Sequence, residues 1–420
     1  MPAAALASGF ALQEQNASGL GNAFAGAGAV AGDASTIFFN PAGMSNLPGT
    51  QFAIAGDLVV PSAKFRNTGS VAAPLQPLGG TGGDAEGPAL VPSGYLSYQV
   101  NPRLWLGVGL NAPFGLVTEY DSDWMGRFQA IKSSLTTYNL NPSIAFKLND
   151  KVTIGAGIDY QYAKAELTNA VDYSALAFGT PLFPLVGAGQ SGTVKLNGND
   201  TAWGFNLGAM FNLNPATRIG LAYRSAIRYT ISGNVSFSDV PAAFGLSPTA
   251  SAGVANGPVS ADLKLPASAS LSLFHKLNPR WDIMADLSWT GWSSFNELKV
   301  VRDNGVVLSD TKENWSDTWR IGAGANYHYN SRWTWRFGVA YDQTPTDDQY
   351  RTARVPDADR YWVALGAQYR LTPRDTIDVG YAHIFVRDAS IDQSAPGAGS
   401  LVGSYDSRSD NIGIQYSRRF

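Results

Sequence analysis

The chain has 420 residues, with 45 glycines, 23 prolines, no cysteine and a formal net charge of −3. The absence of cysteine excludes a disulfide scaffold, the hydrophobic content of 45% excludes a disordered chain, and the small charge excludes a basic surface for nucleic acid. No apolar run approaches the roughly 20 residues that a membrane-spanning helix needs. A large soluble all-β protein and a membrane β-barrel remain.

Residues 1–7 read MPAAALA and lack the basic and apolar regions of a complete signal peptide. Ala5-Leu6-Ala7 nevertheless has the small-x-small form of a signal-peptidase site. We interpret residues 1–7 as a remnant of a signal peptide or a cloning scar, with the mature chain starting near Ser8. An ordinary N-terminal tail is the alternative.

From residue 49 onward, apolar residues alternate with polar residues and glycine. In the run 152–162, Val152, Ile154, Ile158 and Tyr160 alternate with Thr153, Gly155, Asp159 and Gln161. Similar runs cover 201–213, 319–329, 333–341, 361–369 and 377–381. Because successive side chains of a strand point to opposite faces, each run predicts a strand with one apolar face.

Short turn signals separate these runs in pairs. They lie at Asn101-Pro102, Asn149-Asp150, Asn214-Pro215, Asn278-Pro279, Asn330-Ser331 and Thr372-Pro373. Longer Gly/Pro/Ser/Asp-rich connections are expected near 61–89, 115–126, 169–195, 238–258, 302–312, 345–357 and 391–403. Short turns on one rim and long loops on the other, with an even strand number, are typical of outer-membrane barrels, and this spacing predicts fourteen strands.

Aromatic residues separate the membrane barrel from the soluble alternative. Tyrosine and tryptophan gather near strand ends on the apolar face, as in a girdle at a bilayer surface. A soluble β-sandwich would bury its aromatics in the middle of strands of about 3–10 residues, whereas several runs here approach twenty. We therefore predict an all-β membrane protein, a 14-stranded antiparallel transmembrane β-barrel over residues 49–420, in a bacterial outer membrane. The girdle residues are Trp281, Trp289, Trp319, Tyr327, Tyr329, Trp333, Trp335, Tyr341, Tyr361 and Tyr369.

The last strand carries Ile412, Ile414 and Tyr416 on one face and ends in Phe420, although Arg418 interrupts that face. A C-terminal aromatic of this kind predicts recognition by the barrel-assembly machinery.

Residues 8–48 do not alternate and are rich in glycine and alanine, with a helix-start candidate at Asp33-Ala34-Ser35. The segment is too long for a tail and too weakly amphipathic for a separate domain. A fourteen-stranded barrel encloses a lumen that its own side chains do not fill. We expect residues 8–48 to form a plug in that lumen, with small residues packed closely on the inner wall.

The chain resembles the FadL-like family of outer-membrane transporters of long-chain fatty acids and other hydrophobic compounds. The resemblance runs in order along the whole chain. It is carried by Ser8-Gly9-Phe10, Glu14, Gly19-Leu20-Gly21, Ala23-Phe24-Ala25-Gly26, Asp33-Ala34-Ser35, Asn40-Pro41-Ala42-Gly43, Asn111-Ala112-Pro113-Phe114-Gly115-Leu116, Trp124-Met125-Gly126-Arg127 and Asn141-Pro142-Ser143.

This resemblance implies an N-terminal hatch whose signature is Asn40, Pro41 and Ala42. It also implies a third strand with an inward kink that opens a lateral hole in the wall, and we match Asn111, Pro113, Phe114 and Gly115 to that kink. Proline cannot donate to a strand ladder and glycine within a strand marks bends, which agrees with a local loss of pairing. The alternative is that Pro113-Phe114-Gly115 begins an extracellular turn.

Two long loops are unusually apolar and are expected to capture a hydrophobic ligand. Packing of the loops on each other as a rigid cap is the alternative, and the two interpretations are compatible. A carboxylate headgroup would favour a cationic contact inside the barrel, and Arg127, Lys132, Arg320 and Arg336 are candidates that fit interior ion pairs as well. The apolar loop residues are Leu176, Phe178, Leu182, Phe183, Leu185, Val186, Val240, Phe244 and Leu246.

The expected function is passive uptake of hydrophobic compounds, foremost long-chain fatty acids, by loop capture, passage past the hatch and lateral exit. Monoaromatic hydrocarbons or alkanes are the alternative ligands, and an outer-membrane enzyme or adhesin is a third class. His275, His328 and His383 have no catalytic or metal-ligand spacing, so no catalytic residue, metal or cofactor is expected. Expected partners are the hydrophobic ligand, outer-membrane lipid and lipopolysaccharide. No nucleic acid is expected, and the chain is expected to be a monomer.

Overall fold

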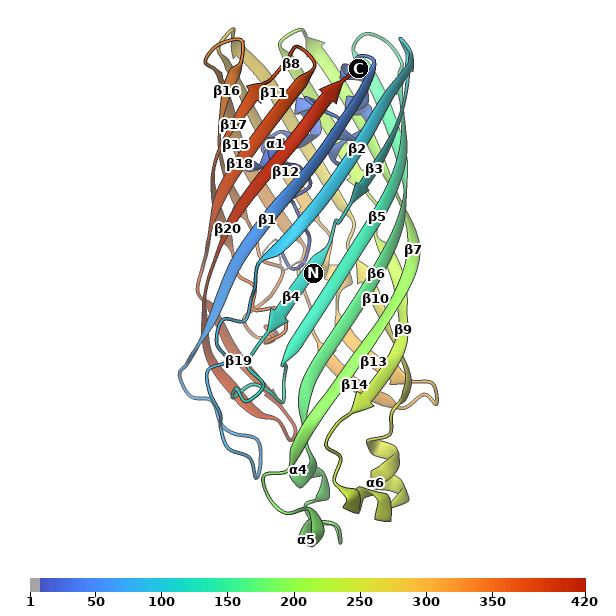
Figure 1. The fold of residues 1–420 in the computed structure, drawn as a ribbon, viewed down its shortest axis with the longest axis vertical. Helices are drawn as coiled ribbons and strands as arrows, with labels where there is room; N and C mark the ends of the chain where they lie inside the picture. Colours follow the sequence, from blue (N-terminus) through green and yellow to red (C-terminus); the bar gives the residue numbers. More distant parts are fainter. Residues whose placement is uncertain (1–7) are drawn as a thin grey trace.

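The computed structural model describes residues 8–420, so the interpretation of residues 1–7 as a signal remnant or scar lies outside the described residues. The wall is a closed antiparallel barrel of 14 strands (Figure 1). It closes because the first strand, β1 (Thr50–Asn67), pairs with both the second strand and the last one. No helix of residues 8–420 is long and apolar enough to cross a membrane.

Six of the fourteen strands are each interrupted and are numbered as two segments: β3/β4, β8/β9, β10/β11, β12/β13, β14/β15 and β18/β19. After β1, the segments are β2 (Ala89–Asn101), β3 (Leu104–Asn111), β4 (Gly115–Glu119), β5 (Lys132–Lys147), β6 (Val152–Asp172), β7 (Ser191–Asn214), β8 (Thr217–Arg224), β9 (Ile227–Phe237), β10 (Gly257–Leu265), β11 (Ser268–Asn278), β12 (Trp281–Thr290), β13 (Glu297–Arg302), β14 (Val307–Lys312), β15 (Thr318–His328), β16 (Trp333–Asp342), β17 (Arg360–Arg370), β18 (Asp375–Val386), β19 (Ala389–Ala395) and β20 (Gly399–Arg419).

The alternating apolar and polar residues predicted from the sequence point alternately to the outer and the inner face of the wall. In β6, Ile154 and Ile158 point outward and are 45% and 54% exposed, whereas Asp159 and Gln161 point inward and are buried. An apolar outer face and a polar inner face are what a barrel in a bilayer requires.

All six predicted short turns join neighbouring strands, and they lie at one rim together with the C-terminus (Figure 1). The opposite rim carries the long connections and is the extracellular rim in barrels of this kind. Its short helices are α4 (Tyr173–Ala177), α5 (Phe183–Val186), η2 (Ala242–Leu246) and α6 (Pro248–Gly253).

Two of the predicted long loops are wrong. Residues 302–312 mostly form a hairpin, because β13 and β14 pair from Glu297 opposite Lys312 up to a turn that contains Gly305 in a left-handed conformation. Most of 391–403 is also strand, since β19 pairs with the start of β20. In both places the Gly and Asp residues, from which a long loop was predicted, form only a tight turn between two paired strands.

Residues 8–48, hereafter the N-terminal segment, lie inside the barrel (Figure 1). They form the short helices α1 (Ala17–Leu20), α2 (Ala27–Val30), α3 (Thr36–Phe39) and η1 (Pro41–Asn46). Glycines of the wall leave room for these helices. A Cβ atom at Gly338 would lie 2.0 Å from the carbonyl carbon of Asn22, and one at Gly366 would lie 2.8 Å from the Cα of Gly21. The glycine-rich inner face therefore allows backbone to pack directly on backbone.

Candidate functional site

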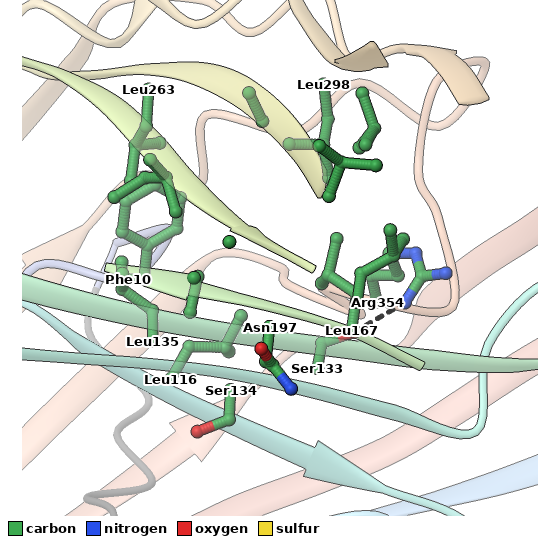
Figure 2. Close-up of a pocket in the computed structure, with 18 of the residues that line it drawn as sticks. Phe10, Leu116, Ser133, Ser134, Leu135, Leu167, Asn197, Leu263, Leu298 and Arg354 are labelled. Carbon is green, nitrogen blue, oxygen red and sulfur yellow. Dashed lines mark hydrogen bonds between the residues drawn. The ribbon is translucent and has the colours of Figure 1, made fainter. Parts of the chain in front are cut away.

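An apolar cavity of about 110 Å³ lies in the extracellular half of the barrel (Figure 2). Leu135 of β5 and Leu263 of β10 approach it from the wall, and Phe10 of the N-terminal segment closes one end. Its wall also includes Leu116, Leu167, Leu196, Ile231, Val259, Phe295, Leu298, Val300 and Val355. A lining of this kind fits an alkyl chain or another apolar group.

The cavity has a cationic end. Arg354 reaches it from the connection between β16 and β17, with Nη1 donating to Ser133 Oγ at 3.1 Å (Figure 2) and Nη2 donating to Asn169 Oδ1 at 3.2 Å. In the described part of the chain these partners are neutral, and the guanidinium forms no ion pair. Burial lowers the pKa of Arg354 to about 10, which leaves it charged at neutral pH. Glu313, a buried carboxyl group whose Oε2 accepts from Trp315 Nε1 at 3.0 Å, also lines the cavity. The site therefore offers a positive charge and a buried carboxyl group next to an apolar space.

Phe10 lies beside both this cavity and Phe114 in the interruption of the third strand. Its ring packs edge-on against Trp292 at 4.6 Å and Phe295 at 5.7 Å, and lies 6.3 Å from Phe114. Trp292 belongs to η3 (Trp292–Ser294), in the connection between β12 and β13, and is fully buried. The chain before Phe10 is held as well, because Gly9 N donates to Asp357 Oδ2 at 2.9 Å and Ser8 Oγ donates to the Gln343 carbonyl at 2.8 Å.

The third strand is interrupted between Asn111, the last residue of β3, and Gly115, the first of β4. The predicted break residues therefore lie together at one interruption of the wall. Pro113 has no N–H to donate. The Phe114 N–H donates to the Thr137 hydroxyl oxygen at 3.0 Å, and the same hydroxyl donates to the Phe114 carbonyl at 2.7 Å. The strand thus leaves its straight path without leaving these buried groups unbonded.

The interruption opens the ladder between the second and third strands. The pairing of β2 with β3 ends at Gly94 opposite Leu110, and within residues 8–420 β4 pairs with β5 as its only strand partner. The N-terminal segment takes the vacant position: Leu12 N donates to the Pro113 carbonyl at 2.8 Å, and Gly115 N donates to the Phe10 carbonyl at 2.9 Å. A short piece of chain that is not part of the wall therefore covers this opening.

The predicted signature Asn40-Pro41-Ala42 packs against β6 and β7. Asn40 is fully buried, its Nδ2 donates to the carbonyls of Gly28 at 2.8 Å and Ala209 at 3.1 Å, and its Oδ1 accepts from Ala42 N at 3.1 Å. A Cβ at Gly208 would lie 2.0 Å from that oxygen. The motif fastens the N-terminal segment to the wall and does not line the apolar cavity.

The apolar loop residues divide into two groups. Leu182, Val186 and Phe244 are buried around Tyr173 in a packed cluster, with Phe183 partly buried against it. Leu176, Phe178, Leu185 and Leu246 remain 55–72% exposed. The loops therefore form a packed cap that also presents apolar side chains to the outside.

The cationic residues selected from the sequence are all engaged elsewhere. Arg320 pairs with Asp286, Arg336 with Asp378, and Lys132 with Glu119 at 3.1 Å. Arg127 donates to three backbone carbonyls. Sequence reasoning missed Arg354 and Phe10 as cavity residues, because neither lies on an alternating strand.

The comparisons with known proteins agree with this architecture. Residues 2–420 match the family described as outer membrane protein transport protein (OMPP1/FadL/TodX). A long-chain fatty acid transport protein of Salmonella typhi is 32% identical over 399 residues, which cover 93% of this chain and 90% of that protein.

Two solved structures share the fold. A Pseudomonas aeruginosa FadL homologue superposes with a TM-score of 0.89 at 28% identity, covering 98% of this chain and 99% of that one. The Ralstonia pickettii toluene transporter TbuX gives a TM-score of 0.68 at 21% identity over the same shares, a likeness of fold alone. This chain therefore belongs to the OMPP1/FadL/TodX family of outer-membrane transport proteins.

Proposed function

We propose that this protein carries long-chain fatty acids across the outer membrane by passive diffusion. The observation that carries the proposal is the apolar cavity that ends at Arg354, a cation whose hydrogen-bond partners are all neutral. A fatty acid would place its alkyl chain among the leucines and its carboxylate against the guanidinium, where the hydrogen bonds are charge-assisted. The long-chain fatty acid transport protein of Salmonella typhi supports the same class of ligand.

The proposed route begins at the exposed apolar loop residues such as Phe178 and Leu246, which would take the ligand from the extracellular side. From there it would reach the cavity beside Arg354. Phe10 and the chain around it would then withdraw, and the ligand would leave sideways through the interruption between β3 and β4. In this role the N-terminal segment is a movable plug. Lateral release into the bilayer gives an apolar ligand a favourable destination that a water-filled pore does not.

The closed wall supports a monomer, because each of the fourteen strands has a partner on both sides along most of its length. We also propose that outer-membrane lipid and lipopolysaccharide surround the apolar band. The C-terminal strand, whose Phe420 is 62% exposed, would be recognised by the barrel-assembly machinery. No catalytic step is part of the proposal.

The test compares oleate with toluene on the purified barrel. Replacing Arg354→Gln should weaken oleate binding about ten- to a hundredfold, the value of roughly 1.5–3 kcal/mol for a hydrogen bond to a charged group, and leave toluene binding unchanged. Arg387→Gln removes a 65% exposed arginine at the same rim and is the matched control. Saturable binding of toluene but not of oleate would identify the hydrocarbon alternative, and an unchanged oleate affinity in Arg354→Gln would remove the headgroup role.

A further inference from the structure

Two cations lie directly opposite each other on the outer face of the wall. In the ladder between β9 and β10, Arg228 is the partner position of Lys264. Both side chains point outward, because their strand neighbours Ile227, Tyr229 and Leu263 are buried on the inner face. The Cβ atoms of directly opposite residues lie about 4.5–5.5 Å apart, and like charges at this spacing destabilise a sheet.

This arrangement is an exception in the barrel. Among the directly opposite residues of paired strands in residues 8–420, no other lysine, arginine, aspartate or glutamate faces a residue of its own sign. The other charged combinations join opposite signs: Lys64 with Asp406, Glu119 with Lys132, Lys276 with Asp282, Glu297 with Lys312, Lys299 with Asp310, Asp342 with both Arg320 and Arg360, and Asp375 with Arg418.

The protein does not neutralise these two cations in the described part of the chain. Within residues 8–420, neither Arg228 nor Lys264 forms an ion pair or a side-chain hydrogen bond. Two carboxylates on the same strands and on β7 are engaged with Thr230 instead. Asp262 Oδ1 accepts from its hydroxyl at 2.9 Å, and Asp200 Oδ2 accepts from its backbone N–H at 2.8 Å. The repulsion therefore stays uncompensated until an anion arrives from outside.

An apolar groove lies on the membrane side of the two cations. β9 and β10 continue β8 and β11 toward the extracellular rim (Figure 1), and the groove lies on the outer face of β8 and β11 and of their neighbours β7 and β12. Its volume is about 650 Å³. Ala269 lies in it between two aromatic residues, opposite Tyr223 of β8 and opposite Trp289 of β12. The groove is also lined by Leu207, Leu221, Leu271, Leu287 and Trp319.

The groove and the cations suit the two parts of one molecule. An alkyl chain over Ala269 gains close packing against leucine and aromatic side chains, which a smooth lipid-facing wall does not offer. Tyrosine and tryptophan mark the level where acyl chains meet headgroups. A phosphate between a guanidinium and an ammonium accepts charge-assisted hydrogen bonds from both and cancels their repulsion.

We propose that Arg228, Lys264 and the groove over Ala269 bind a phosphorylated, acylated lipid of the outer leaflet, the class to which the lipid part of lipopolysaccharide belongs. The site gives a definite place on the wall to the lipid surroundings proposed above. It depends on the position of the bilayer band and not on the identity of the transported compound. A soluble anion alone would leave the groove unused, and a lipid without phosphate would leave the repulsion in place.

The first test measures binding of purified, bis-phosphorylated lipid A to the detergent-solubilised barrel by native mass spectrometry. The double variant Arg228→Gln/Lys264→Gln should weaken this binding about twenty-five-fold, since each cation near an anionic lipid contributes roughly a factor of five. Lys64→Gln/Arg408→Gln also removes two exposed, outward cations, from β1 and β20, and is the matched control. This control should bind lipid A like the native chain.

A second variant tests the groove without changing a charge, and it keeps the test valid should the double variant assemble poorly. Ala269→Trp puts an indole where the alkyl chain would lie and should weaken lipid A binding about tenfold, because the chain loses its close packing against the wall. Ala285→Trp makes the same change at an outward alanine of β12 that does not line the groove, and it should leave binding unchanged.

Equal binding of lipid A by the native chain and by Arg228→Gln/Lys264→Gln would overturn the proposal, as would equal binding of lipid A and its dephosphorylated form by the native chain. An unchanged affinity in Ala269→Trp would overturn it as well, and so would full displacement of lipid A by inorganic phosphate, because the site would then recognise an anion alone. None of these results affects oleate binding at Arg354, so failure of this inference and failure of the proposed function are distinguishable.

Discussion

Apolar and polar residues alternate along both halves of strand β7, but the apolar residues face opposite sides of the wall in the two halves. Near the extracellular rim, Val194 and Leu196 point inward and are buried while Lys195 is exposed. Further along, Trp203 and Phe205 point outward and are 67% and 46% exposed. The first stretch has its apolar face inside and the second has it outside, and the two differ in what surrounds them.

The neighbouring strands repeat this reversal. In β9 and β10, Ile231 and Leu263 point inward while Arg228 and Asp262 point outward, whereas in β11 Leu271 points outward. Bilayer therefore surrounds the part with the apolar outer face, and water surrounds the part that encloses the apolar cavity. The difference shows that the cavity lies above the membrane, so a ligand in it still has to reach the bilayer.

The largest effect should come from a charge in the bilayer band. Leu273→Arg places a guanidinium opposite Ala285, midway between the girdle residues Trp281 and Trp289, and should cost about 2–4 kcal/mol in the free energy of unfolding from lipid vesicles. Ser232→Arg, which points outward from the part above the membrane, should change it by less than about 0.5 kcal/mol. Equal costs at the two positions would show that the reversal does not mark the membrane boundary.

A charge in the cavity should act on the ligand and not on the barrel. Leu263→Asp puts a carboxylate among the cavity leucines and should weaken oleate binding about a hundredfold, because an unpaired charge in an apolar site excludes the alkyl chain. Displacement of a fluorescent fatty acid measures this affinity. Lys264→Asp alters the neighbouring residue on the other face, and an equal loss there would argue against the cavity as the binding site.

A side chain in the interruption of the third strand should slow release. Gly115→Leu fills the passage next to the N-terminal segment and should reduce uptake of oleate into vesicles about tenfold, while its binding to the cavity stays the same. Gly94→Leu is the control, since a Cβ at Gly94 meets nothing within 4 Å and lies at the end of the same ladder. Unchanged uptake in Gly115→Leu would count against exit at this place.

Much of the fold could be predicted because strands of a barrel obey a local rule. The alternation around Ile158 and Phe205 and the turns at Asn149 and Asn214 depend on residues close in sequence, and the structure confirms them. The break after Asn111 was also visible, because proline cannot donate to a ladder. The reversal at Leu196 was readable in principle, since the apolar residues change from even to odd positions before Trp203.

The cavity itself could not be predicted in this way. Arg354 reaches it on a connection that folds back into the lumen, and Phe10 lies in a segment without period. Their positions depend on contacts between residues far apart in the chain, such as Arg354 with Ser133 and Phe10 with Trp292.

The central claim is that a ligand in the cavity above the membrane leaves through the interruption of the third strand when the N-terminal segment moves away. Ala11 and Phe114 are bridge partners across this opening, and the chain has no cysteine of its own. A disulfide between Ala11→Cys and Phe114→Cys would hold the segment in place without changing the rest of the wall. Oleate uptake into vesicles should stop when the pair is oxidised and return when it is reduced, with each single variant insensitive to the oxidant; equal uptake by the oxidised and reduced double variant would contradict the account.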